Sequence, residues 1–294
     1  MSSNHYFDGL RKLVDAELDR VVPPESAPPD VIHRAMRYSL FAGGKRIRPI
    51  LCLESARAVS DEAPGVERAA CALELVHTYS LIHDDLPALD NDDLRRGRPT
   101  CHKVFGEAMA ILTGDALLTL AFQVLCAPGP IPAGRRAPLA NELSAASGTV
   151  EGMIGGQVFD LEGEGQTPTA EMLHRIDRAK TGALLTASVR MGAICAGATD
   201  EQLEALTCYG RHIGLAFQIV DDILDVEQSS EQLGKTAGKD AAQHKITFPA
   251  VYGLETSHRM AREECSQAVL ALRMFGSRAG RLSEIADMIV QRTK

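Results

Sequence analysis

Several residue types are scarce in this chain of 294 residues, and each scarcity narrows what it can be. Tryptophan is absent and aromatic residues make up only 4%. A β-sandwich would need more aromatic and β-branched residues, so the composition favours helices. The seven cysteines are scattered without a CxxC pair, which is typical of reduced thiols in a cytosolic protein. We therefore expect a helical protein located in the cytoplasm.

The chain also lacks a net basic charge and long apolar runs. The formal net charge is -8, whereas a nucleic-acid binder would show a basic face. No apolar run approaches the roughly 18 residues of a membrane span. The N-terminal residues lack the charged-then-apolar layout of a signal peptide. These features predict no nucleic-acid partner and no transmembrane segment.

Helical periodicity is what the sequence does contain. Apolar residues recur at three- and four-residue spacing, and Pro- or Gly-rich connectors separate the periodic segments. Helices are predicted at residues 5–20, 30–41, 48–60, 66–86, 107–126, 136–154, 169–180, 182–196, 200–227, 247–264 and 279–291. No sustained strand pattern, repeat or shift in composition interrupts them. The sequence predicts one all-α domain, residues 1–294, formed by about ten or more helices.

Two acidic clusters lie in otherwise apolar stretches, and basic residues follow both. The first contains Asp84, Asp85 and Asp90, and the second contains Asp221 and Asp225. Carboxylates packed this closely repel, and their burial is costly unless cations intervene. Mg²⁺ takes oxygen ligands and commonly shares them with substrate phosphates. The pattern predicts an enzyme that holds a diphosphate between two carboxylate sets.

The spacing of the second cluster fits a helix directly. Asp221 and Asp225 are four residues apart, so on a helix they share one face at about 6 Å from each other. Gln218 lies three residues earlier on the same stripe and adds an amide oxygen or a hydrogen bond. This face is suited to shared coordination of metal ions.

The first cluster needs a distortion to act in the same way. Asp84 and Asp90 are six residues apart and would face different ways on an ideal helix. Pro87 disrupts a helix because it has no N–H to donate. If Pro87 and Ala88 bulge out as two extra residues, Asp84 and Asp90 return to an effective four-residue spacing. A lone Asp-Asp pair is commonly a solvated helix end, but two such clusters favour a metal site.

Basic and loop residues complete the pattern. Lys45 and Arg48 follow two glycines on a turn, where Arg offers a planar fork for phosphate oxygens and Lys a mobile charge. The segment does not match a P-loop. Asp92 and Asp93 are interpreted as solvated loop charges. Further cations and a hydroxyl could reach a metal-bound diphosphate: Lys180, Thr181, Lys235 and Lys245.

Four segments carry a resemblance to a known family: GGKRIRP at 43–49, ELVHTYSLIHDDLPALDNDDLRRGRPTCH at 74–102, GGQ at 155–157 and FQIVDDILD at 217–225. The chain resembles the trans-isoprenyl diphosphate synthases from about residue 5 to its end, most closely the bacterial farnesyl diphosphate synthases. The resemblance implies an all-α bundle around a deep central cavity, of the isoprenoid synthase type. It also implies a homodimer and three Mg²⁺ ions in each active site, with Mn²⁺ as an alternative.

The resemblance also implies a role for each matched residue. Asp84 and Asp90 would hold two ions and Asp221 the third, with Asp85 and Asp225 in support. The candidate catalytic residues are Asp84, Asp85, Asp90, Asp221, Lys180 and Lys235. Isopentenyl diphosphate would be bound by Lys45, Arg48, His77 and Arg96. The allylic diphosphate would be bound by Arg95, Lys180, Thr181, Gln218, Lys235 and Lys245.

The implied reaction is a head-to-tail condensation of isopentenyl diphosphate with dimethylallyl and geranyl diphosphate, giving farnesyl diphosphate and releasing diphosphate. Tyr79 and Ser80 lie five and four residues before Asp84, where a bulky side chain would limit product length. The alternative is that Tyr79 is only a core aromatic residue.

Rival interpretations are a geranyl or geranylgeranyl diphosphate synthase, a class I terpene cyclase, or a non-catalytic partner subunit. A cyclase carries a different second motif, and a partner subunit loses the Asp-rich motifs that this chain keeps.

Overall fold

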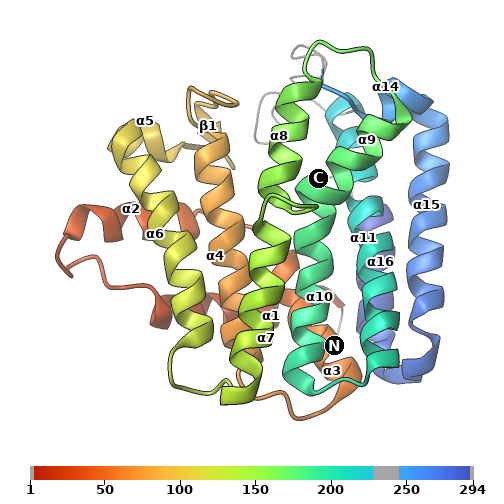
Figure 1. Cartoon of the computed structure of the whole chain (residues 1–294), viewed down its shortest axis with the longest axis horizontal. Helices are drawn as coiled ribbons and strands as arrows, with labels where there is room; N and C mark the ends of the chain where they lie inside the picture. Colours follow the sequence, from red (N-terminus) through yellow and green to blue (C-terminus); the bar gives the residue numbers. More distant parts are fainter. Residues whose placement is uncertain (1–2, 228–244, 292–294) are drawn as a thin grey trace. The chain divides into compact units, whose positions relative to one another are not determined.

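The computed structural model describes residues 3–227 and 245–291, and most of these are helical (Figure 1). The elements are α1 (Ser3–Val21), α2 (Asp30–Leu40), α3 (Ile47–Val59), α4 (Val66–Asp84), β1 (Leu94–Arg95), β2 (Arg98–Pro99), α5 (Cys101–Phe105), α6 (Glu107–Cys126), α7 (Ala133–Ser147), α8 (Met153–Gly163), α9 (Ala170–Asp177), the π-helix η1 (Arg178–Gly182), α10 (Ala183–Ala196), α11 (Asp200–Glu227), α14 (Phe248–Tyr252), α15 (Leu254–Ala271), the 3-10 helix η2 (Arg273–Ala279) and α16 (Gly280–Val290). The predicted all-α fold is confirmed.

The described helices group into two compact units. One contains Met1–Ile50 and Gly65–Ala140, and the other contains Leu51–Pro64 and Asn141–Lys294. In the first unit α4 lies beside α6 and also contacts α1 and α2 (Figure 1). Most of α4 is buried because its sequence, rich in Ala and Leu, places small and apolar side chains on nearly every face. This helix positions the first acidic cluster at its C-terminal end.

The second unit is centred on α11, which packs against α10, α15 and α16. Its largest fully buried side chains are Tyr209 and Phe248. The Tyr209 hydroxyl donates to the carbonyl of Leu282 at 2.8 Å, which ties α11 to α16. A buried hydroxyl with a partner avoids the desolvation cost of an unpaired polar group. The second acidic cluster lies near the C-terminal end of α11.

Helix α6 corrects one expectation about apolar runs. Among the described residues, Glu107–Cys126 is the one helix long and apolar enough to cross a membrane by length and composition, with a hydropathy of 1.8. Such a score is weak support for a span, because core helices of soluble proteins pass the same test. In this fold α6 packs against α2, α4 and α5, and 33% of the apolar stretch is buried.

Several element boundaries differ from the prediction. The helix expected at 136–154 is two helices, α7 and α8, separated by a loop in which Glu151 has a φ of 53°. The helix expected at 247–264 breaks at Gly253, where φ is 79°. The hairpin β1–β2 and the short α5 were not predicted. The single-domain organisation stays a prediction.

Candidate active site

The first acidic cluster begins where α4 ends at Asp84. The backbone N–H of Asp90 donates to the carbonyl of Asp84 at 2.8 Å, across six residues rather than the four of an α-helix. The two additional residues are accommodated in the turn from Leu86 to Leu89. The Leu89 N–H donates to the Leu86 carbonyl at 2.9 Å. Pro87 and Ala88 lie in this turn outside α4, and the hydrogen bond brings the backbones of Asp84 and Asp90 together. The effective four-residue spacing of the two carboxylates stays a prediction.

Asp85 is held by Arg95. Its side chain is 4% exposed, and the carboxylate accepts from Arg95 Nε at 2.7 and 2.9 Å and from Nη2 at 2.6 Å. Burial nevertheless raises the pKa of Asp85, and the contacts from Arg95 lower it by less. Arg95 comes from β1, so the unpredicted hairpin is the element that places this cation. Asp85 therefore acts as an anchor for a guanidinium.

The two neighbouring loop aspartates differ from each other. Asp93 is 74% exposed and pairs with Lys103 at 2.7 Å, as expected for a solvated loop charge. Asp92 is only 13% exposed, 3.8 Å from Arg95, and its carbonyl accepts from the Thr100 hydroxyl at 2.8 Å. The interpretation of Asp92 as a solvated charge was wrong, because the hairpin folds back over it.

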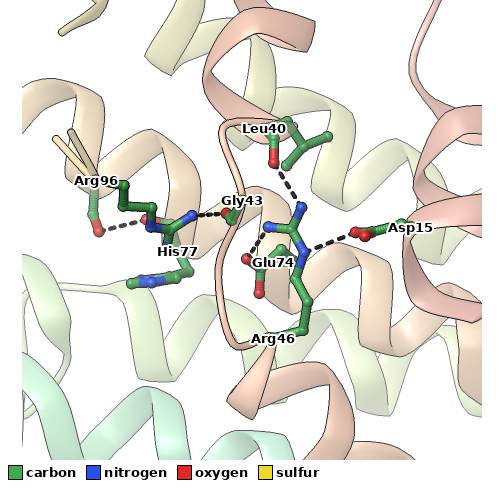
Figure 2. A network of polar contacts seen from close by, with 8 residues as sticks. Asp15, Leu40, Gly43, Arg46, Glu74, His77 and Arg96 are labelled. Atoms are coloured by element: carbon green, nitrogen blue, oxygen red, sulfur yellow. Dashed lines mark hydrogen bonds and ion pairs between the residues drawn. The ribbon is translucent and has the colours of Figure 1, made fainter. Parts of the chain in front are cut away.

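The loop between α2 and α3 carries the basic segment. Gly43 and Gly44 have φ values of 90° and 137°, which a residue with a side chain rarely adopts. Arg96 donates to the Gly43 carbonyl, and a Cβ at Gly44 would lie 2.5 Å from Arg96 Nη1. Lys45 is exposed and Arg48 is half-buried. The loop glycines thus let the Arg96 side chain lie directly on the backbone (Figure 2).

His77 lies on α4 beside this group of cations. Burial of the imidazole, followed by the positive charges of Arg48, Arg96, Arg95 and Arg46, lowers the pKa of His77 well below its ordinary value. A neutral imidazole results at physiological pH. Of the four residues expected to bind isopentenyl diphosphate, the first unit thus brings Arg48 and Arg96 near His77, and Lys45 lies on the loop that accepts Arg96.

The second acidic cluster is helical, as predicted. Asp221 and Asp225 both lie on α11, with Asp221 half-buried and Asp225 5% exposed. The intervening Asp222 accepts from Gln218 Nε2 at 2.8 Å and from the Phe248 N–H at 2.9 Å. Asp222 thereby orients the side-chain amide of Gln218.

Lys180 and Thr181 are brought to this cluster by the π-helix η1. The Thr181 hydroxyl donates to Gln218 Oε1 at 2.8 Å, and Lys180 Nζ pairs with Asp160 at 2.6 Å. A Cβ at Gly156 would lie 2.1 Å from the Lys180 backbone nitrogen, so glycine is required where α8 approaches η1. A π-helical turn within a longer helix is frequently found at a functional site.

Asp177 was missed by the sequence analysis. It is 7% exposed, and its Oδ2 has no hydrogen-bond partner. Burial, followed by the negative charges of Asp222 and Asp160, raises its pKa well above the ordinary value. Asp160 was also missed. Both lie near Lys180 and could have been found only by knowing how α8 and α9 pack.

Tyr79 and Ser80 lie on α4 upstream of Asp84. Tyr79 is 5% exposed, its hydroxyl has no partner, and its ring meets His83 edge-on with centroids 5.7 Å apart. His83 Nε2 lies 3.1 Å from the Ile111 carbonyl, and a Cβ at Gly114 would clash with its ring. Ser80 is half-buried and donates to the His77 carbonyl at 2.9 Å. Tyr79 therefore fills buried space beside His83, and His83 is the residue that meets α6.

Two residues predicted to bind the allylic diphosphate remain. Lys245 is half-buried. Lys235 lies outside the described residues. Within the described residues no group of three or more His, Cys, Asp or Glu side chains forms a metal cage.

Comparison with known proteins decides the family. A family model described as polyprenyl synthetase matches residues 29–275, which include both acidic clusters. This chain belongs to the polyprenyl synthetase family. It is 45% identical to farnesyl diphosphate synthase of Geobacillus stearothermophilus over 295 residues, covering 99% of this chain and 98% of that one.

Two further relatives have names that include other products. The chain is 50% identical to the large subunit 1 of the heterodimeric chloroplastic geranylgeranyl pyrophosphate synthase of Arabidopsis thaliana, covering 86% of this chain and 69% of that one. It also matches the structure of an FPP/GFPP synthase from Zymomonas mobilis, with a TM-score of 0.87, 36% identity and 98% of each chain covered. The chain is thus a trans-prenyl diphosphate synthase, an enzyme of isoprenoid biosynthesis whose substrates are isoprenyl diphosphates.

Proposed function

We propose that this polyprenyl synthetase is a farnesyl diphosphate synthase. It condenses isopentenyl diphosphate head-to-tail with dimethylallyl diphosphate and then with geranyl diphosphate, and it releases diphosphate at each step. The buried ring of Tyr79, five residues before Asp84 on α4, carries the choice of product. The similarity to the Geobacillus stearothermophilus enzyme over nearly the whole of both chains supports it. Geranylgeranyl diphosphate is the alternative product, which the plant relative supports.

The donor set fits Mg²⁺. Asp84 and Asp90 supply carboxylates from two residues joined by a backbone hydrogen bond, and Asp221 and Asp225 supply two from one helix. Mg²⁺ is usually held by one or two carboxylates together with substrate phosphates, so no all-protein cage is needed. We propose that these four residues hold three ions, with Mn²⁺ as an alternative. When bound, the ions would neutralise negative charge that grows on the leaving diphosphate.

The chain's own donors bind the two substrates in this proposal. Lys180 and Gln218 donate to the allylic diphosphate, as do the cations Arg95, Lys235 and Lys245. The Thr181 hydroxyl contacts the diphosphate by exchanging its bond to Gln218 Oε1 for one to a phosphate oxygen. Asp160 and Asp222 orient two of these donors before substrate arrives, which lowers the cost of ordering them in the transition state.

On the isopentenyl diphosphate, Lys45, Arg48 and Arg96 supply positive charge, and the neutral His77 hydrogen-bonds without adding charge. The allylic C–O bond breaks, the isopentenyl double bond attacks the resulting cation, and a C–C bond forms. The proton lost from the new product goes to the departing diphosphate.

We also propose a cytoplasmic homodimer. All seven cysteines are free thiols, which suits a reducing compartment. On α6, Ile111 is 46% and Leu112 is 51% exposed. Exposed apolar residues grouped on one helix are typical of a protein interface, and a second copy of this chain would cover them.

The experiment supplies the purified protein with Mg²⁺, isopentenyl diphosphate and either dimethylallyl or geranyl diphosphate. Products are dephosphorylated and identified by chromatography. Farnesol as the main alcohol with either substrate is the expected result. Geraniol or geranylgeraniol would keep the chemistry but overturn the argument from Tyr79. If the protein condenses isopentenyl diphosphate with neither substrate, the proposed activity is wrong, and a non-catalytic partner subunit is favoured.

A further inference from the structure

Arg46 lies inside the basic loop but is buried away from solvent. Its side chain is 2% exposed, whereas the adjacent Lys45 is exposed. Nothing in the proposed reaction uses Arg46. A fully buried guanidinium between two residues assigned to substrate binding therefore requires another explanation.

The Arg46 guanidinium joins three helices to the loop. Nε donates to Asp15 on α1 at 2.9 Å, and Nη1 donates to Glu74 on α4 at 2.7 Å. Nη2 donates to the carbonyl of Leu40, the last residue of α2, at 2.7 Å (Figure 2). Each nitrogen thus has an acceptor from a different element, as the rigid geometry of an arginine fork allows.

The backbone of Arg46 is also unusual. Its φ is 53°, in the region that favours glycine. Such a conformation persists in other residues only where the surroundings fix it. The Arg46 carbonyl accepts from the N–H of Ile50 at 3.0 Å, which is the first hydrogen bond of α3. Arg46 therefore sets where α3 begins, and Arg48 lies in the first turn of that helix.

The same contacts reach the other residues of the isopentenyl site. Glu74 precedes His77 by three residues on α4, so both lie on one side of the helix. Arg96 donates to the Gly43 carbonyl, three residues before Arg46 (Figure 2). A displacement of the loop would therefore move Lys45, Arg48 and Arg96 relative to His77.

We propose that Arg46 is a positioning residue for isopentenyl diphosphate: its ties to Asp15, Glu74 and Leu40 fix the loop beside His77. That loop carries Lys45, leads into Arg48 on α3 and accepts the Arg96 side chain at Gly43. The inference rests on the proposed function, because it assumes that isopentenyl diphosphate binds there. A buried ion pair such as Arg46–Glu74 adds little net stability compared with an apolar pair. We therefore assign the Arg46–Glu74 ion pair to holding the loop in place rather than to stability.

The test measures KM for each substrate separately in variants of Arg46. Arg46→Lys keeps the charge but cannot reach three acceptors. We expect it to raise KM for isopentenyl diphosphate about tenfold and to leave kcat and KM for geranyl diphosphate within about twofold. Arg46→Gly relieves the backbone strain but lacks the side chain, so we expect the same selective rise. Asp15→Asn removes the charge of one half-exposed acceptor, so a smaller rise is expected.

Arg190→Lys is the matched control. Arg190 also uses its fork, donating to Glu142 and Thr207 at 2.7 Å, but it belongs to the other unit. This variant should leave KM for isopentenyl diphosphate unchanged. Thermal melting of every variant checks that the fold is retained.

Three results would overturn the inference: an equal rise in both KM values, wild-type values in Arg46→Lys, or wild-type values in Arg46→Gly. Calorimetric titration with isopentenyl diphosphate keeps the test independent of turnover. If the wild-type protein does not condense the substrates, the proposed function fails. Binding that is about tenfold weaker in Arg46→Lys would still support the positioning role, and equal binding would contradict it.

Discussion

The backbone N–H of Asp90 bonds to the carbonyl of Asp84 at 2.8 Å, although six residues separate them in sequence. Two residues in excess of an α-helical turn are absorbed between Leu86 and Leu89. The hydrogen bond therefore brings the backbones of Asp84 and Asp90 together outside the helix, whereas Asp221 and Asp225 lie four residues apart on one unbroken helix.

This relationship predicts different outcomes for two deletions in the bulge. Removing Pro87 and Ala88 together leaves Asp84 and Asp90 four residues apart, so we expect the condensation rate to stay within about tenfold of wild type. Removing Pro87 alone rotates Asp90 by about 100° around the helix, so the rate should fall at least about a hundredfold. Steady-state rates of condensation for the two deletion variants test this prediction. Equal rates for the two deletions would contradict the spacing argument.

Tyr79 is predicted to limit product length. Tyr79→Ala removes the buried ring beside His83 and should shift the product from farnesyl to geranylgeranyl diphosphate, at a cost of about 3 kcal/mol in stability. Tyr79→Phe is the control, because it keeps the ring and removes only a hydroxyl without a partner. Chromatography of the alcohols should show farnesol for Tyr79→Phe. Farnesol from both variants would refute the role of Tyr79.

Asp177 should make stability depend on pH. Its pKa is raised well above the ordinary value by burial and by Asp222 and Asp160, so the folded chain keeps a proton that the unfolded chain releases above about pH 4. The free energy of unfolding then falls as pH rises through the interval between the two pKa values. The Asp177→Asn variant has no ionisable group at this position, so its free energy of unfolding does not fall over this interval.

We expect calorimetry to give Asp177→Asn a higher melting temperature than wild type, with a difference that grows between about pH 5 and pH 8. Asp61→Asn is the control, because Asp61 is 90% exposed and its ion pair contributes little. A difference that does not change with pH, or a less stable Asp177→Asn at pH 8, would show that Asp177 is ionised in the folded chain.

Leu112 tests the proposed homodimer. It is 51% exposed on α6, so Leu112→Glu should not disturb the core but should place a charge in an apolar interface. We expect the variant to sediment as a monomer at concentrations where the wild type is a dimer. Met288→Glu on α16, where Met288 is 41% exposed, should leave the dimer intact. A dimeric Leu112→Glu would remove α6 from the interface.

Local patterns predicted much of this fold. The helix at 107–126 matches α6 at both ends because a long apolar stretch is bounded by Gly106 and by the turn after Cys126. The bulge after Asp84 was predicted because proline has a definite effect on a helix. The face shared by Asp221 and Asp225 followed from helical spacing alone.

Features that depend on packing were not predicted. The break between α7 and α8 is stabilised by the Gly155 N–H, which donates to the Gly148 carbonyl at 3.1 Å. No proline marks this break in the sequence. Arg95 needed the hairpin to meet Asp85. Arg46, Asp160 and Asp177 gain their roles from partners at least 17 residues away or on other elements, which periodicity does not reveal.

The central claim is that the first acidic cluster carries the chemistry of a prenyl diphosphate synthase, and a pair of matched aspartate variants tests it most directly. Asp84→Asn and Asp93→Asn make the same chemical change nine residues apart, but only Asp93 is a 74% exposed loop charge paired with Lys103. Rates of farnesyl diphosphate formation with Mg²⁺ should fall at least about a thousandfold in Asp84→Asn. Asp93→Asn should stay close to wild type. Equal rates in the two variants would contradict the account.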